Sequence, residues 1–190
     1  MSKFLLLLGP SGVGKSTIIE ELCRIDNRFV YISPYMTRPL REGEKNKISI
    51  SGEQMDEMWS RGELLVINEL YGIRYATPRL PIAEALAGGS FPVLDWPVSR
   101  IEVMTQAFPD RLHVVYVSPP SIEALRQRLA KDGRDVDGSR LKNASEELEA
   151  YWACRYVGIC DLEVVSEENQ MLKIAHAIYD SYLKSFHSQT

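Results

Sequence analysis

The chain reads Gly9-Pro10-Ser11-Gly12-Val13-Gly14-Lys15-Ser16 directly after the apolar stretch Phe4–Leu8. These eight residues fit the pattern Gly-x-x-x-x-Gly-Lys-Ser/Thr. In that pattern the glycines let successive backbone N–H groups point at phosphate oxygens at the start of a helix. The pattern requires a buried strand before the loop and a helix after it, and the apolar spacing on both sides supplies them. We therefore predict a phosphate-binding loop made of Gly9, Ser11, Gly12, Val13, Gly14, Lys15, Ser16 and Thr17.

Three side chains near this loop have predicted chemical roles. Lys15 can reach the β- and γ-phosphates of ATP, and the Ser16 hydroxyl can bind Mg²⁺. Asp95 ends the apolar run that starts at Phe91, at the end of a strand where a carboxylate can hold Mg²⁺ through water. The alternative for Asp95 is a cap on the loop that follows the strand. ATP and Mg²⁺ are the predicted cofactors.

The rest of the chain alternates between short apolar runs and stretches of helical periodicity. The runs predict buried strands at 4–8, 29–32, 93–95, 112–117 and 162–165. Short buried strands separated by helices predict an α/β fold with a parallel sheet covered on both faces. Residues 34–85 and 131–140 interrupt the alternation, and we expect both segments to fold over the carboxyl edge of the sheet, where ligands bind in such proteins.

The composition limits the class of protein. The 190 residues are 45% hydrophobic and 25% charged, as in an ordinary globular chain, so we predict one domain over 1–190. A net charge of −4 provides no field for nucleic acid or anionic lipid, and we expect neither partner. Phe4–Leu8, the longest apolar run, is far shorter than the ~20 residues that span a bilayer. Three scattered cysteines without zinc spacing favour a cytoplasmic location. A monomer and a homodimer both stay open.

A second candidate anion site lies at Thr37-Arg38-Pro39-Leu40-Arg41-Glu42-Gly43-Glu44. Two guanidiniums held close together repel each other unless an anion lies between them, and arginine suits bidentate recognition of phosphate. Taken alone, Arg-x-x-Arg is typical of a solvated turn. Because it follows a phosphate-binding loop, it indicates the acceptor-phosphate site of a kinase.

Over nearly its whole length the chain resembles the guanylate kinase family. The matching segments are the Gly9–Ser16 loop, Thr37–Glu44, Tyr75-Ala76-Thr77, Leu94-Asp95, Val117–Ser121 and Arg140-Leu141. The resemblance implies the fold of P-loop NTPases, with a five-stranded parallel core at 1–33, 86–130 and 141–190. It also implies an inserted subdomain for the acceptor at 34–85 and a short lid at 131–140.

The resemblance also implies roles for individual residues. Arg38, Arg41 and Tyr75 would hold the phosphate of the acceptor, a nucleoside monophosphate, with Thr77 beside them. Arg134 and Arg140 would be lid arginines that close over the transferred phosphoryl group. Together with Lys15, Arg38 and Asp95, they form the predicted catalytic set.

The chain departs from the family where the family reads guanine. Val66 stands where a glutamate would pair with the guanine edge, and Asp95-Trp96-Pro97 lacks a second aspartate. The segment 46–51 has no tyrosine for the acceptor phosphate. A serine facing guanine would align near Pro34, where Ser33 is the candidate substitute. Glu69 is the candidate for the missing carboxylate, provided that the hairpin register shifts by three residues. We expect reduced selectivity for GMP, because unpaired groups on a buried guanine edge weaken binding.

Three functions therefore stay open. The first is ATP-dependent phosphorylation of a nucleoside monophosphate, with GMP or dGMP as the acceptor that the family implies. The second is phosphorylation of a non-guanine phosphate ester such as ribose 1,5-bisphosphate. Asn46-x-Ile48-x-x-Ser51 is similar to the kinases of that ester, although Arg41 counts against it. The third is a non-catalytic binding module, against which the complete phosphate-binding loop argues.

Overall fold

The structure is a computed structural model that describes residues 2–41, 44, 46–70, 72–133, 135, 137–155 and 158–186. Its centre is a parallel sheet of five strands in the order β2-β7-β1-β8-β9. The strands are β1 (Phe4–Leu8), β2 (Phe29–Tyr31), β7 (Phe91–Asp95), β8 (Leu112–Ser118) and β9 (Leu162–Val165). The predicted α/β fold with a five-stranded parallel core is confirmed.

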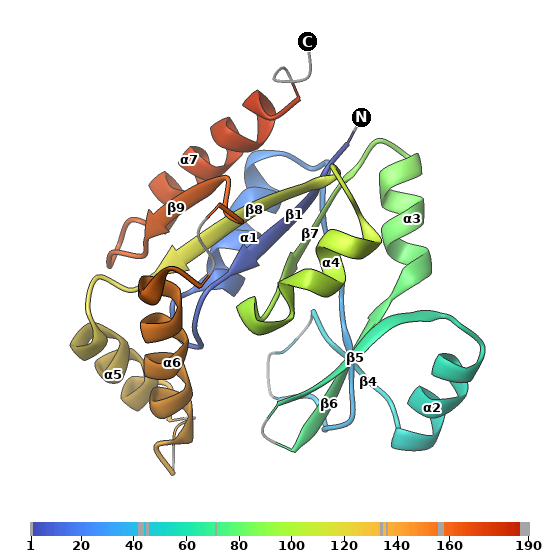
Figure 1. Cartoon of the computed structure of the whole chain (residues 1–190), viewed down its shortest axis with the longest axis horizontal. Helices are drawn as coiled ribbons and strands as arrows, with labels where there is room; N and C mark the ends of the chain where they lie inside the picture. Colours follow the sequence, from blue (N-terminus) through green and yellow to red (C-terminus); the bar gives the residue numbers. More distant parts are fainter. Residues whose placement is uncertain are drawn as a thin grey trace.

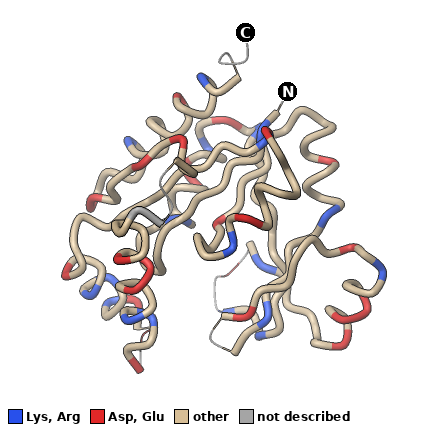
Figure 2. Tube along the Cα trace, viewed as in Figure 1, with Lys and Arg blue, Asp and Glu red and all other residues tan. Residues whose placement is uncertain are grey.

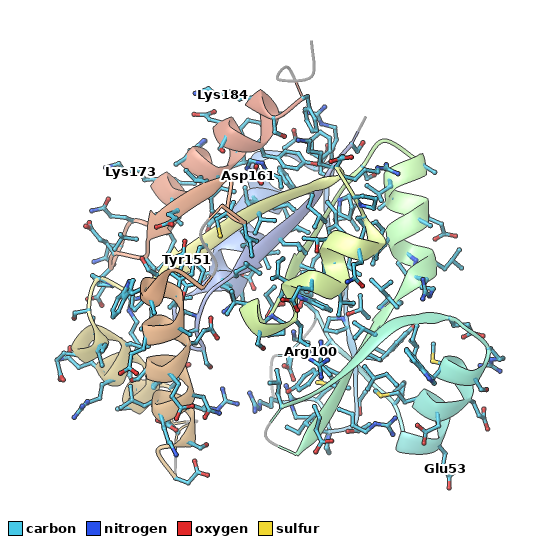
Figure 3. The ribbon with its side chains drawn as sticks, in the orientation of Figure 1. Glu53, Arg100, Tyr151, Asp161, Lys173 and Lys184 are labelled. Atoms are coloured by element: carbon cyan, nitrogen blue, oxygen red, sulfur yellow. The ribbon has the colours of Figure 1, made fainter. Side chains whose placement is uncertain are left out.

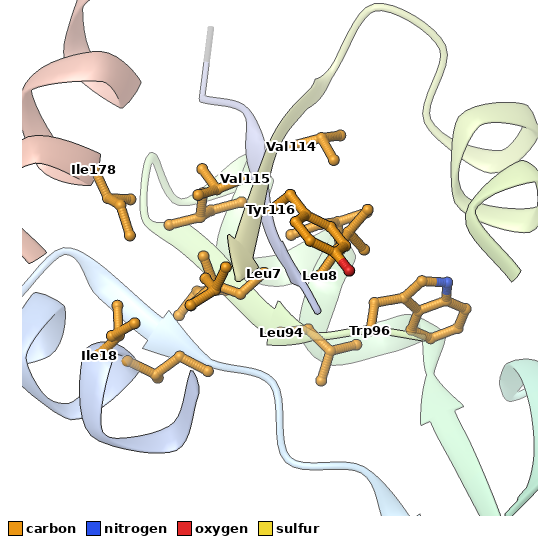
Figure 4. Close-up of a cluster of buried hydrophobic side chains, with 14 of the residues drawn as sticks. Leu7, Leu8, Ile18, Leu94, Trp96, Val114, Val115, Tyr116 and Ile178 are labelled. Atoms are coloured by element: carbon orange, nitrogen blue, oxygen red, sulfur yellow. The ribbon is translucent and has the colours of Figure 1, made fainter. Parts of the chain in front are cut away.

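The central strands are buried on both faces. All five residues of β1 are inaccessible to solvent, which explains why this strand reads as an unbroken apolar run. Successive residues of β8 face opposite layers: Val115 lies on the side of Ile18 and Ile178, and Tyr116 lies on the side of Trp96 (Figure 4). The core therefore continues from the helices on one face, through the sheet, to those on the other.

Helices cover both faces of the sheet. α1 (Lys15–Ile25) packs against α7 (Met171–Lys184) on one side of the sheet. α3 (Arg79–Ala87) packs against β7. The short helix η1 (Val98–Arg100) leads into α4 (Ile101–Ala107), and α5 (Ile122–Lys131) precedes α6 (Ser139–Ala150) and the single π-turn η2 (Tyr151–Arg155). Within the described part of the chain, no helix is both long and apolar enough to cross a membrane.

Part of the segment between β2 and α3 forms a second, four-stranded sheet in the order β4-β3-β6-β5. Its strands are β3 (Tyr35–Met36), β4 (Ile48–Ser49), β5 (Leu64–Leu70) and β6 (Ile73–Pro78), and helix α2 (Gly52–Ser60) packs on it. Ser51 and Gln54 form a reciprocal capping box at the start of α2. In Figure 1 this sheet and the α5–α6 pair lie on opposite sides of the carboxyl edge of the parallel sheet.

Candidate active site

The loop between β1 and α1 has the backbone that its glycines predict. Gly9, Gly12 and Gly14 all have positive φ, and Gly14 is the N-cap of α1 in the left-handed region. A Cβ at Gly9 would lie 2.2 Å from the Val117 carbonyl oxygen, so only glycine fits there. Ser16 and Thr17 are exposed in the first turn of α1, where backbone N–H groups lack helical partners. The start of α1 is therefore an exposed helix N-terminus that carries two hydroxyl side chains.

Lys15 lies folded over this loop. Its ammonium donates to the Gly9 carbonyl oxygen and, at 2.9 Å, to the Pro10 carbonyl oxygen. Burial lowers the pKa of Lys15 below its ordinary value, although the nearby carboxylates Glu147 and Asp95 oppose this. A phosphate group would replace the two carbonyls as partner and would favour the charged form.

Asp95 lies at the carboxyl end of β7, beside β1. Its Oδ1 atom accepts a hydrogen bond from the Tyr31 hydroxyl at 2.9 Å, and the Lys47 ammonium is 3.8 Å away. Burial alone would raise the pKa of Asp95, but Lys47, Lys15 and Tyr31 outweigh it, so the pKa is lowered. An ionised carboxylate here and the exposed Ser16 hydroxyl are the hard oxygen donors that suit Mg²⁺.

Arg38, which the sequence predicts to bind the acceptor, is paired with a carboxylate of its own loop. Arg38 donates to both Glu44 oxygens, at 2.8 and 2.7 Å, and the Arg41 backbone N–H donates to Glu44 Oε2 at 3.1 Å. The hydrogen bonds from Arg38, with that from Arg41, lower the pKa of Glu44 to about 2. We expected an anion between the two arginines. For Arg38, that anion is the Glu44 carboxylate of the protein itself.

The Tyr75 hydroxyl lies beside the Arg38 guanidinium, and together with Glu44 it raises the pKa of Arg38. The structure therefore brings two of the predicted phosphate-binding residues together. The Arg41 side chain is exposed, and Ser33 is half-buried between β2 and β3. Figure 2 shows basic residues on the second sheet as well as on α5 and α6, on both sides of the sheet edge.

The β5–β6 hairpin corrects the expectation for Glu69. The register pairs Val66 with Thr77, and Glu69 with Arg74. Residues three apart on a strand point to opposite faces, so Glu69 cannot take the place of a carboxylate at Val66. Glu69 is exposed on the same face as Arg74, whose guanidinium binds Asp56 of α2 at 2.5 Å, whereas Val66 and Thr77 are buried on the other face.

One of the two predicted lid arginines reaches the phosphate-binding loop. Arg140, near the start of α6, donates through Nη1 to the Ser11 hydroxyl at 3.2 Å. Asp135 fixes this helix start because its carboxylate accepts from the backbone N–H groups of Arg140 and Leu141, at 2.8 and 3.1 Å. Arg134, the other predicted lid arginine, lies outside the described residues.

Sequence reasoning missed several charged groups in this region. Lys47 donates to the Tyr31 hydroxyl at 2.8 Å and so joins the segment before β4 to the end of β2. Glu147 of α6 lies near Lys15, and burial raises its pKa while Lys15 opposes the shift. Glu147 follows Arg140 by about two helical turns, and this spacing could have indicated that the two residues share one face of α6. No pattern in the segment 46–51 indicated that the Lys47 side chain would point toward Tyr31 and Asp95.

Ser166, which follows β9, contacts the backbone of the phosphate-binding loop. It is fully buried, and its hydroxyl donates to the Val13 carbonyl oxygen at 2.5 Å. Arg128 of α5 donates to the same hydroxyl at 2.9 Å. Ser166 therefore stabilises the phosphate-binding loop through a hydrogen bond to its backbone.

Comparison with known proteins decides the family. The family model described as guanylate kinase matches residues 1–180. The chain belongs to the guanylate kinase family. Among its curated relatives, a guanylate kinase of Nostoc sp. is 33% identical over 154 residues, covering 78% of this chain and 77% of that protein. A guanylate kinase of Thermobifida fusca is 35% identical over 151 residues, covering 76% of each chain.

Solved structures agree on the fold. A guanylate kinase of Anaplasma phagocytophilum superposes with a TM-score of 0.75 at 22% identity, covering 96% of this chain and 85% of that one. A shikimate kinase of Acinetobacter baumannii superposes with a TM-score of 0.54 at 16% identity, covering 97% and 94%. Membership of the guanylate kinase family confirms the predicted class of enzyme, a nucleoside monophosphate kinase.

Proposed function

We propose that this guanylate kinase family member transfers the γ-phosphoryl group of ATP to the phosphate of a nucleoside monophosphate, GMP or dGMP being the acceptors that its relatives suggest. The observation that carries the proposal is a chain of three charged side chains that leads from the phosphate-binding loop to the edge of the second sheet. Lys47, before β4, reaches within 3.8 Å of Asp95, whose charge also acts on Lys15 of the phosphate-binding loop. We also propose that 34–85 is the acceptor subdomain and 131–140 the lid.

In this reaction a phosphate oxygen of the acceptor attacks the γ-phosphorus of ATP. The new O–P bond forms as the bond from the γ-phosphorus to the β,γ-bridging oxygen breaks, and ADP leaves with that electron pair. The acceptor oxygen is already anionic, so no general base is needed. The enzyme's task is to align the two groups and to offset their charge.

Four of the predicted cationic side chains have a place in this scheme. Lys15 leaves the carbonyls of Gly9 and Pro10 to hold the phosphates of ATP, and Arg38 with Arg41 and Tyr75 holds the acceptor phosphate. Arg140, already in contact with Ser11, offsets charge on the transferred group. Ser16, and Asp95 through water, would hold Mg²⁺, which when bound neutralises the charge of the phosphate oxygens.

The residues on β5 favour an acceptor whose base makes few specific contacts with the protein. Val66 is buried and apolar where the family resemblance implies a carboxylate, and Glu69 lies on the opposite face. This supports a second candidate acceptor, a base-free phosphate ester such as ribose 1,5-bisphosphate. The complete phosphate-binding loop argues against a purely non-catalytic module.

An ADP-release assay with ATP–Mg²⁺ tests the proposal. The acceptors are GMP, dGMP, AMP, CMP, UMP and ribose 1,5-bisphosphate, each at the same concentration. We expect turnover of at least one monophosphate and its loss, by about 1,000-fold or more, in Lys15→Met. Turnover of ribose 1,5-bisphosphate alone would replace the first acceptor by the second. ATP binding without phosphorylation of any acceptor would contradict both.

A further inference from the structure

Asn68 of β5 is a buried polar side chain with an unsatisfied oxygen. Its relative exposure is 7%, and its Oδ1 atom is buried without a hydrogen-bond partner in the described part of the chain. Nearly all buried side-chain oxygens in folded proteins have a partner, so an unpaired one requires an explanation. A ligand that donates a hydrogen bond is one such explanation.

The strand register places Asn68 on the acceptor side of the hairpin. Asn68 lies directly opposite Tyr75 of β6, and Val66 lies directly opposite Thr77. Residues paired across antiparallel strands share a face, so all four side chains belong to one surface. The Tyr75 hydroxyl on that surface lies beside the Arg38 guanidinium. Asn68 is therefore the cross-strand neighbour of Tyr75, one of the residues proposed to hold the acceptor phosphate.

The spacing along β5 indicates which part of an acceptor Asn68 would meet. A strand rises about 3.3 Å per residue, so Val66 lies about 7 Å farther along the strand than Asn68, away from Tyr75. In a nucleotide the sugar is next to the phosphate and the base lies beyond it. An acceptor whose phosphate is held by the Tyr75 hydroxyl and whose base lies over Val66 would therefore place its sugar beside Asn68.

We infer that Asn68 is a specificity-determining residue that reads the sugar of the acceptor, its Oδ1 atom accepting a hydrogen bond from a sugar hydroxyl. The inference rests on the proposed function for the acceptor's phosphate, which Arg38 and Tyr75 hold. The polar recognition of this site is thereby displaced from the base to the sugar. The ligand class is a phosphate monoester of a hydroxylated sugar, with or without a base.

Calorimetric binding of two acceptors that differ only in the sugar tests this inference. The probes are GMP and 2′,3′-dideoxyguanosine monophosphate, which share base and phosphate. We expect the wild-type protein to bind GMP about tenfold more tightly, the effect of one hydrogen bond to a buried group. In Asn68→Leu, a near-isosteric apolar variant, the ratio falls to about twofold through weaker binding of GMP.

Two further variants separate recognition from folding. Asn68→Ser keeps a hydroxyl on the strand and is expected to retain part of the preference for GMP, which covers the case in which Asn68→Leu does not fold. Glu69→Gln, next in sequence but exposed on the opposite face, leaves the ratio and both affinities unchanged.

Equal wild-type affinities for the two probes would overturn the inference, as would no measurable binding of either. A ratio that stays at the wild-type value in folded Asn68→Leu or Asn68→Ser would also overturn it. ATP turnover with GMP is measured on the same preparations. Sugar preference without turnover contradicts only the proposed function, and turnover without sugar preference contradicts only the role of Asn68.

Discussion

Glu44 fixes the side chain of Arg38, the proposed acceptor-side arginine, before any ligand binds. The Arg38 and Glu44 side chains are 13% and 20% exposed and are joined by two hydrogen bonds. Arg38 Nε is buried and has no partner among the described residues. Glu44 and the Pro39 carbonyl oxygen therefore fix the guanidinium in place, which reduces the ordering that binding of the proposed acceptor phosphate must supply.

Replacing Glu44 by glutamine tests the strength of this pair. The pKa of Glu44 is lowered from 4.5 to about 2, so the pair stabilises the folded state above pH ~4.5. That contribution is lost as the pH falls toward the folded pKa. The pKa shift sets an upper bound of about 3 kcal/mol, and we expect Glu44→Gln to lower the free energy of unfolding by about 1–3 kcal/mol at pH 7.

Urea unfolding of both proteins at pH 7, 4.5 and 3 measures this difference. The matched control is Glu53→Gln, at an exposed position in the first turn of α2 that projects away from the protein (Figure 3), where we expect a change within about 0.5 kcal/mol. A gap between wild type and Glu44→Gln that widens on acidification would contradict the assignment.

At the scale of elements, the turn from β1 into α1 depends on Gly9. Its φ is +126°, and an added Cβ would lie 2.2 Å from the backbone of the neighbouring strand β8, which cannot move without breaking the sheet. We expect Gly9→Ala to cost about 3 kcal/mol or more of unfolding free energy and to abolish ATP binding.

Gly62→Ala is the matched control for Gly9→Ala. Gly62 also has positive φ, at +72°, but no atom would lie within 4 Å of a methyl group added there, so only the left-handed conformation is penalised, by about 1 kcal/mol. Chemical denaturation and calorimetric titration with ATP–Mg²⁺ compare the two variants. Similar losses of stability would show that the contact with β8 is unimportant.

The limits of the strands in the parallel sheet were the most predictable feature of the fold, and the register of the β5–β6 hairpin was the least. Leu162–Val165 was predicted with the observed limits, because buried strands of a parallel sheet read as continuous apolar runs. The sequence predicted that β7 begins at Val93, but the strand begins at Phe91, because a proline such as Pro92 is tolerated near the start of a strand. A register shift between Leu64 and Val66 sets which face each β5 side chain occupies, and no sequence pattern revealed it.

At the scale of the whole molecule, the site combines side chains that are far apart in sequence. The glycine pattern predicted Lys15, the Arg-x-x-Arg pattern predicted Arg38, and the family resemblance predicted Tyr75 and Arg140, because each belongs to a recognisable motif. Lys47 and Asn68 belong to none. Their proposed roles rest on neighbours on other elements, Tyr31 and Asp95 for Lys47 and Tyr75 for Asn68, which only the folded chain brings together.

Lys47 provides the last prediction, because it connects the second sheet to the end of the parallel sheet. Its side chain is 20% exposed and that of Asp95 is 30% exposed, at a distance of 3.8 Å, so the pair should add less than about 1 kcal/mol to stability. Its charge lies close enough to lower the pKa of Lys15, and therefore lies near the γ-phosphate that Lys15 is proposed to hold.

We accordingly expect Lys47→Met to lower kcat with ATP and the preferred acceptor by about 100-fold, the effect of removing one preorganised cationic donor, while the unfolding midpoint stays near that of wild type. Lys47→Arg should recover most of the rate because it restores the charge. Lys173→Met removes an exposed ammonium on α7, remote from the second sheet (Figure 3), and should leave kcat unchanged. A lowered unfolding midpoint with normal kcat would mean that Lys47 only stabilises the packing of the second sheet on the core. The negative charge of the transferred phosphoryl group would then have to be offset by Lys15 and the arginines alone.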